Sequence, residues 1–113
     1  MNSMKVKVLS LARRDLKYGF DFYERQESGV GSYFVNTLYS ETSALCITAG
    51  IHSKRGKLFR MKSRKFPYWI YYVIRDEIVY VLTILDARRS PSTIRRREKQ
   101  VQLSVYDSET FNP

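Results

Sequence analysis

Side chains that could bind a polyanion are concentrated in the second half of this 113-residue chain. Residues 54–99 contain fourteen lysines and arginines but only four acidic residues, whereas residues 1–53 contain six and five. Residues 100–113 carry only two acidic residues, and the whole chain has a net charge of +9. A surface that serves solubility alone does not need such asymmetry. We therefore expect a polyanionic partner to meet the second half of the chain, with a solubility surface as the plain alternative.

The segment 58–62, LFRMK, carries two basic residues at a spacing suited to a strand. Because successive side chains of a strand point to opposite faces, Arg60 and Lys62 share one face while Phe59 and Met61 share the other. If helices cover the Phe59/Met61 face, Arg60 and Lys62 project from an open face. The segment therefore predicts a basic surface on one side of a sheet.

Two further arginines, Arg88 and Arg89, directly follow a predicted strand, and a strand end holds a side chain rigidly. Tyr68, Trp69 and Tyr72 are expected at the edge of the same basic surface. Positive charges interleaved with aromatic rings suit RNA or single-stranded nucleic acid, because the charges neutralise phosphates and the rings stack on bases. The alternative is that these rings belong to the core and the charges to a solvated rim. The expected residues for binding nucleic acid or another target are Arg60, Lys62, Arg64, Lys65, Tyr68, Trp69, Arg88, Arg89, Arg95 and Arg96.

Metal-free RNA cleavage is one chemistry that this set permits. Arg60, Lys62 and Arg88 are the candidate catalytic residues, because their charges would stabilise the phosphorane formed during cleavage. Such a reaction also needs a side chain that moves protons, and none is obvious in the sequence. Asp86 stands beside arginines, so we expect it to orient one of them rather than to act as a catalyst.

Composition argues against several other kinds of site. Cys46 is the single cysteine and His52 the single histidine, which rules out an internal disulfide and a zinc site. A glycine-rich phosphate loop and the clustered carboxylates of a two-metal hydrolase are also missing from the sequence. We therefore expect no metal and no cofactor. No apolar run approaches the ~20 residues of a membrane span, and the N-terminus lacks the long apolar core of a signal peptide, so we expect a cytoplasmic protein without membrane association.

The periodicity of apolar residues predicts the elements that must position these side chains. They are a strand at 5–12 near a sheet edge, helices at 13–26 and 33–49, and strands at 58–62, 68–74 and 78–85. The last two strands form a hairpin in the middle of the sheet, joined by the tight turn Arg75-Asp76-Glu77. Asp15 falls in the first turn of the first helix, where it matches the helix dipole.

The order β-α-α-β-β-β predicts an α+β domain in which a helix hairpin packs on one face of a small, mostly antiparallel sheet. The length favours a single domain, which we expect at residues 1–99. Residues 51–57 are expected to form a polar loop. Beyond them, Pro91 begins a turn that a short helix follows, and residues 100–113 form a C-terminal tail or edge segment.

This order of elements, together with the motif FPYWIYY, a turn, VYVLTILDARR and then Ser-Pro, resembles the RelE/ParE toxin superfamily of type II toxin–antitoxin systems. The resemblance covers about residues 4–97. It implies a small sheet with two helices packed on it, and an antitoxin encoded beside the toxin. It also implies that a mostly disordered segment of the antitoxin folds onto the toxin and covers its basic face, which gives a toxin–antitoxin hetero-oligomer.

Within that superfamily, the resemblance separates two branches. The RNA-cleaving branch uses two basic residues on the second strand, an arginine on the third, an arginine after the last strand and a tyrosine near the C-terminal helix. Arg60, Lys62 and Arg88 stand at three of these positions, but Trp69 and Ile94 stand at the other two. This departure favours the ParE-like branch, whose members are known for inhibiting DNA gyrase. The alternatives are an mRNA endonuclease, ribosome-dependent or free, and a non-toxic basic nucleic-acid-binding domain.

Overall fold

Helices and strands follow one another in an α+β order in the computed structural model, which describes residues 3–111. In chain order the elements are β1 (Lys5–Val8), α1 (Ser10–Gln26), α2 (Val30–Ser43), α3 (Leu45–Thr48), β2 (Ser53–Arg55), β3 (Leu58–Lys62), β4 (Tyr68–Arg75), β5 (Ile78–Asp86), α4 (Pro91–Ser104) and the short 3₁₀ helix η1 (Ser108–Phe111). The α+β class predicted from the sequence is confirmed.

The strands form one five-stranded sheet in the order β1-β5-β4-β3-β2. Only β1 runs parallel to its neighbour, and the other three pairings are antiparallel. The β4–β5 hairpin therefore lies in the middle of the sheet, and β1 lies at an edge, both as predicted. These two central strands are apolar on both faces, which requires cover on both sides.

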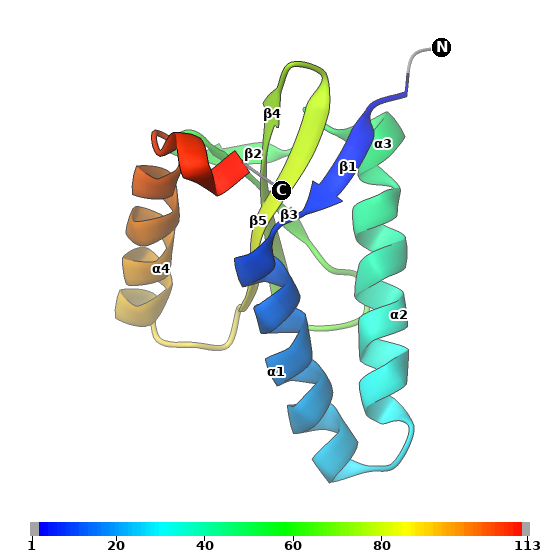
Figure 1. The fold of residues 1–113 in the computed structure, drawn as a ribbon. Helices are drawn as coiled ribbons and strands as arrows, with labels where there is room; N and C mark the ends of the chain where they lie inside the picture. Colours follow the sequence, from blue (N-terminus) through cyan, green and yellow to red (C-terminus); the bar gives the residue numbers. More distant parts are fainter. Residues whose placement is uncertain (1–2, 112–113) are drawn as a thin grey trace.

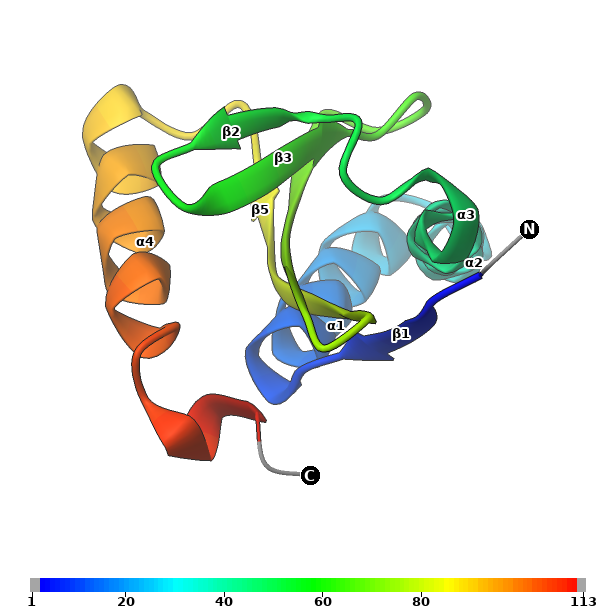
Figure 2. The ribbon, with the colours of Figure 1, turned by 90° about the horizontal axis from the view of Figure 1, so that it is seen from above.

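Helices supply that cover on both faces of the sheet, so the molecule has three layers (Figures 1 and 2). One core cluster joins α1 and α2 to the sheet through residues such as Leu16, Phe34 and Leu38. A second cluster joins α4 to the opposite face through Val101 and Tyr71. The expected helix hairpin on one face is confirmed, but the other face is not open, because α4 lies on it.

The α1–α2 hairpin is held by an unusually close helix contact at Gly19. A Cβ atom at this position would lie 2.3 Å from Cε2 of Phe34, which is fully buried. At the loop between the helices, the Glu24 carboxylate accepts hydrogen bonds from the backbone N–H groups of Gly29 and Gly31 at 3.0–3.1 Å. Close packing and this side-chain cap together fix the angle at which α2 returns along α1.

Replacing Gly19 by alanine is expected to lower the free energy of unfolding by about 1–3 kcal/mol, because the added methyl group overpacks the helix contact. Helix propensity alone predicts the opposite sign, a gain of about 1 kcal/mol. Urea denaturation measures the difference, with Arg14→Ala on the exposed side of the same helix as the control. A Gly19→Ala variant that is more stable than the parent chain would contradict the prediction, because it would mean that the helices move apart to fit the methyl group without a cost in free energy.

The turn between β4 and β5 contains two residues in the left-handed region, Asp76 with φ of 52° and Glu77 with φ of 61°. Two consecutive positive φ angles are what a type I′ hairpin turn requires. Aspartate tolerates this conformation, whereas glutamate has no side-chain bond that favours it. Glu77 is therefore a strained position in the most central hairpin of the sheet.

Glu77→Gly is expected to raise the free energy of unfolding by about 1 kcal/mol, because glycine adopts a positive φ without steric cost. Asp76→Gly is the matched control and should give a smaller gain. Thermal or urea denaturation of the three chains distinguishes these outcomes. A loss of stability in Glu77→Gly would contradict the assignment of strain to this residue.

Several of the sequence-based expectations about the first half of the chain need correction. The first strand ends at Val8 and α1 begins at Ser10, three residues earlier than expected. Asp15 consequently lies beyond the first turn of α1, and it is buried. The polar segment 51–57 contains β2, an exposed strand that pairs with β3. The second helix begins at Val30 and is interrupted at Ala44.

The segment after β5 is longer and more ordered than a short helix with a tail. Ser90 caps the start of α4 by accepting a hydrogen bond from the Thr93 N–H, and Pro91 occupies the first turn, a favourable combination at a helix start. The helix continues past residue 99 to Ser104, and Val101 and Val105 are buried against the sheet. The expected boundary between residues 99 and 100 therefore falls inside α4.

Candidate functional site

The Arg60 side chain lies beneath α4 rather than on an open face of the sheet. Its guanidinium carbon is 3.7 Å from the centroid of the Trp69 ring, and its Nη1 atom is 3.5 Å from Oε2 of Glu98 on α4. Only 20% of the side chain is exposed. Helices α1 and α2 do pack against the Phe59/Met61 face. The expectation that Arg60 projects from an open face is nevertheless wrong, because α4 covers that face.

Glu98 is buried and joins three other side chains at this surface. The Tyr71 hydroxyl donates to Oε2 of Glu98 at 2.6 Å, and Nε of Arg55 and Nη1 of Arg60 each lie 3.5 Å from the same oxygen. Burial and the hydrogen bond to Glu98 raise the pKa of Tyr71 to about 12, so the hydroxyl is protonated at neutral pH. This carboxylate ties α4 to β3 and β4 and neutralises part of the charge of Arg60.

The remaining basic residues of β3 and the loop after it reach solvent. Lys62, Arg64 and Lys65 are all exposed. The Lys62 Nζ atom is 4.9 Å from the centroid of the Trp69 ring, and the Lys65 Nζ atom is 5.5 Å from that of Tyr33. Of the β3 residues expected to project into solvent, Lys62 is the one that does so.

Arg88 is held on the α1 side of the sheet by the carboxylate of Asp86. Its Nε and Nη2 atoms donate to the two oxygens of Asp86 at 3.0 and 2.9 Å, which confirms the expected orienting role of Asp86. Burial alone would raise the pKa of Asp86, but the bonds from Arg88 lower it below its ordinary value. Arg88 also contacts Tyr23 of α1 at 3.4 Å. Because Arg60 contacts α4, these contacts place the two arginines on opposite faces of the sheet.

Two of the aromatic residues expected at the surface belong to the core. Tyr68 is buried, with its ring centroid 4.9 Å from that of Phe34, and burial together with the charge of Asp86 raises its pKa to about 12. The Tyr72 hydroxyl accepts a hydrogen bond from the Gly50 N–H at 2.9 Å and lies 2.6 Å from Nδ1 of His52. For these rings the core alternative is correct, and neither is available for stacking on a base.

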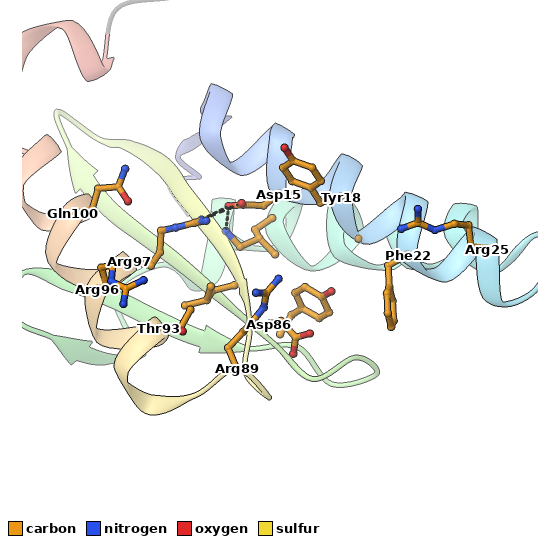
Figure 3. A pocket seen from close by; sticks show the side chains of 14 residues that line it. Asp15, Tyr18, Phe22, Arg25, Asp86, Arg89, Thr93, Arg96, Arg97 and Gln100 are labelled. Carbon is orange, nitrogen blue, oxygen red and sulfur yellow. Dashed lines mark hydrogen bonds and ion pairs between the residues drawn. The ribbon is translucent and has the colours of Figure 1, made fainter.

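A groove of about 720 Å³ opens between α1 and α4 at the end of β5 (Figure 3). It exists because β1 is short. β1 pairs with β5 only over residues 78–81, so within residues 3–111 the following part of β5 has no neighbouring strand on that side. Residues 84–86 of β5 line the groove, flanked by side chains of the two helices.

An ion pair forms the inner wall of this groove. Asp15 of α1 accepts hydrogen bonds from the Thr83 hydroxyl at 2.6 Å and from the Ile84 N–H at 2.9 Å. Nη1 of Arg97 on α4 donates to Oδ1 of Asp15 at 3.0 Å and to Thr83 at 2.8 Å. Asp15 therefore replaces the missing strand as the partner of the β5 edge, and it links α1 to α4.

Arg89 and Arg96, both expected binding residues, line this groove, whereas the exposed Arg95 does not. The sequence-based set did not include Arg25, which lines the groove from α1, or the pair Asp15 and Arg97. The available signal was an acidic residue at a position of the apolar helix stripe, which indicates a buried ion pair.

No three His, Cys, Asp or Glu side chains of the described part of the chain come together in a way that could hold a metal ion. No helix within residues 3–111 has both the length and the apolar character needed to cross a membrane.

A solved structure shares this fold, although no protein-family model and no curated protein matches the chain. A chain of the chromosomal ParDE TA system from P. aeruginosa matches with a TM-score of 0.71 at 16% sequence identity, covering 76% of this chain and 98% of that chain. A chain of the toxin–antitoxin complex RelBE2 from Mycobacterium tuberculosis matches with a TM-score of 0.45 at 20% identity, covering 74% and 98%. At 16% identity, the match to the ParDE chain shows a shared fold, in agreement with the fold that the sequence resemblance implied.

Proposed function

We propose that this protein is the toxin of a type II toxin–antitoxin system, a growth inhibitor that a cognate antitoxin neutralises. The observation that carries the proposal is the fold, which is similar over most of both chains to a chain of the ParDE TA system. The positive charge of residues 54–99 is consistent with a basic surface for an antitoxin segment to cover. The proposed assembly is a toxin–antitoxin hetero-oligomer in the cytoplasm.

We further propose that the toxin acts in the ParE-like manner, by binding its target, with DNA gyrase as the leading candidate. The positions of the basic residues support this. Arg60 is engaged by Glu98 on the α4 side, and Arg88 is engaged by Asp86 on the α1 side. Three charges that stabilise one phosphorane have to converge on one point, and the contacts of Arg60 and Arg88 hold these two apart.

An mRNA endonuclease, ribosome-dependent or free, is the second candidate, and one observation favours it. Glu98, which lies 3.5 Å from Arg60, is a carboxylate of the kind that moves protons in catalysis. It would fill the proton-transfer role for which the sequence offered no residue. The burial of Glu98 and its contacts with three other side chains argue against this role.

Induced expression in bacterial cells tests the toxin proposal. Without the product of the neighbouring reading frame, growth is expected to stop, with filamentation and a DNA-damage response if gyrase is the target. Co-expression of the neighbouring product should restore growth. Undiminished growth at a matched level of soluble, folded protein would contradict the proposal.

A triple variant, Arg60→Ala, Lys62→Ala and Arg88→Ala, tests whether the basic residues contact the target. Growth arrest is expected to be lost, mainly through Lys62 and Arg88, whose exposed side chains present charge that the target would neutralise. Growth arrest that survives these three substitutions would contradict a mechanism based on the basic residues.

The matched control for that variant removes the same amount of charge elsewhere. Lys5→Ala, Arg14→Ala and Lys17→Ala change three exposed residues of the first half of the chain. This control should keep full growth arrest. Because Arg60→Ala leaves Glu98 with one arginine fewer, urea denaturation of the purified variants has to establish that both are folded under the conditions of the growth assay.

A further inference from the structure

The groove between α1 and α4 has the dimensions of a small-molecule site. Its volume of about 720 Å³ lies within the range typical of ligand pockets. The inner wall is rigid, because the Asp15–Arg97 ion pair and the β5 backbone form it. The groove is separate from the surface of Arg60 and Lys62, which contact Trp69 and do not line it.

The charge of the groove favours an anion. Arg25, Arg89 and Arg96 line it, and none of the three forms an ion pair with an acidic residue in the described part of the chain. The two carboxylates of the lining, in contrast, are already neutralised by Arg97 and Arg88. Arg89 and Arg96 lie on the β5–α4 side of the groove, whereas Arg25 lies at the far end of α1, beyond Phe22 (Figure 3). The uncompensated guanidinium groups of Arg89 and Arg96 suit a phosphate, which accepts hydrogen bonds from an arginine in a bidentate manner.

Two aromatic rings of α1 complete the lining. Tyr18 and Phe22 are four residues apart on the helix, and both line the groove. Tyr18 is 68% exposed and Phe22 is 40% exposed, although both are large and partly apolar. Figure 3 shows them on α1, with the arginines of the β5–α4 segment across the groove. Exposed rings beside arginines form the combination that holds a nucleic-acid base and its phosphate.

We propose that this groove binds a nucleotide, with its base against Tyr18 and Phe22 and its phosphate beside Arg89 and Arg96. The inference goes beyond the proposed toxin function and does not depend on it. A free nucleotide and one unit of a nucleic-acid strand both present a base and a phosphate, so either could bind in this way. An extended acidic peptide fits less well, because it would pair with the β5 edge, and the Ile84 N–H of that edge already donates to Asp15.

Calorimetric titration of the full-length chain with AMP tests the proposal, with adenosine and inorganic phosphate as separate probes. AMP is expected to bind at least about tenfold more tightly than either probe, because base stacking and phosphate contacts both contribute. A hexa-adenylate strand that binds more tightly than AMP would assign the groove to a strand unit, and weaker or equal binding would assign it to the free nucleotide. Phosphate that binds as tightly as AMP would overturn the proposal.

Variants locate the binding in the groove. Tyr18→Ala and Arg96→Gln should each weaken AMP binding by about fivefold or more, the loss expected for one stacking ring or one charged contact. Tyr33→Ala and Arg95→Gln, which change an exposed ring and an exposed arginine outside the groove lining, should leave binding unchanged. Equal effects of the two pairs would overturn the proposal, and so would an acidic peptide, such as hexaglutamate, that binds more tightly than AMP. None of these measurements depends on growth arrest.

Discussion

Replacing Asp15 by alanine is expected to lower the free energy of unfolding by about 3–5 kcal/mol, a large part of the stability of a domain of this size. The carboxylate accepts three kinds of hydrogen bond, from the Thr83 hydroxyl, the Ile84 N–H and the Arg97 guanidinium. Its removal leaves the Ile84 N–H unpaired at the β5 edge and Arg97, which is 28% exposed, without its counter-charge. Urea denaturation measures the loss.

The control for this prediction is Asp21→Ala on the same helix. Asp21 forms only an exposed pair with Lys17 at 4.0 Å, so its loss should cost less than about 0.5 kcal/mol. Asp15→Asn keeps the shape of the side chain and should fall between the two, which provides a measurement if the alanine variant does not fold. Equal stabilities of the Asp15 and Asp21 variants would contradict the role assigned to the buried ion pair.

Replacing Glu98 by alanine has the second large expected effect, a loss of about 2–4 kcal/mol together with faster hydrogen exchange along α4. Glu98 is the point at which α4 is tied to the sheet by Tyr71, Arg55 and Arg60. Without it, the buried Tyr71 hydroxyl loses its acceptor, and α4 keeps its apolar contacts, the bonds of Arg97 to Asp15 and Thr83, and the hydrogen bond from the Lys57 N–H to Gln102. Amide hydrogen exchange resolved along the chain measures whether the loss is concentrated in α4 or spread over the fold.

The neighbouring residue supplies the control for Glu98. Lys99 is exposed on the same turn of α4, so Lys99→Ala should leave both the stability and the exchange rates of α4 within experimental error of the parent chain. If Glu98→Ala speeds exchange no more in α4 than in α1, the view of Glu98 as the tie between α4 and the sheet is wrong.

The sheet and the helix hairpin were predictable because their apolar residues repeat with a clear period. The strands β3, β4 and β5 lie where the alternation and apolar runs placed them. β2 was not predicted because all three of its residues are exposed, so its sequence lacks the alternation of apolar and polar residues that a buried face produces. Gly56, with φ of 62°, turns the chain between β2 and β3. A glycine inside a polar run is the one signal that favoured a hairpin there.

The candidate site was predicted only in part, because its geometry depends on which helix covers which face. Sequence alternation correctly put Arg60 opposite Phe59, but it carries no information about the position of α4. Glu98 falls in line with the partly buried Ile94 and the buried Val101 on α4. A charged residue at a position of an apolar stripe indicates a buried partner, although the sequence does not say which residue that is.

Asp15 illustrates the same limit on α1. It lies between the buried residues Ala12 and Gly19 on the stripe that faces the sheet, whereas the sequence analysis placed it in the first turn of the helix, matched to the helix dipole. Its actual partners are 68, 69 and 82 residues away along the chain. Contacts at such a separation follow from the packed fold and not from any local pattern, so the groove that Asp15 helps to form was not predictable.

The central proposal is a growth-inhibiting toxin that binds its target and does not cleave RNA. The most direct test maps the 5′ ends of cellular transcripts within minutes of induced expression, at the time growth stops. We predict the same 5′ ends as in uninduced cells, since Arg60 and Arg88 are held on opposite faces of the sheet. New 5′ ends that appear with the growth arrest, and that are lost in the Arg60→Ala, Lys62→Ala and Arg88→Ala triple variant, would contradict it.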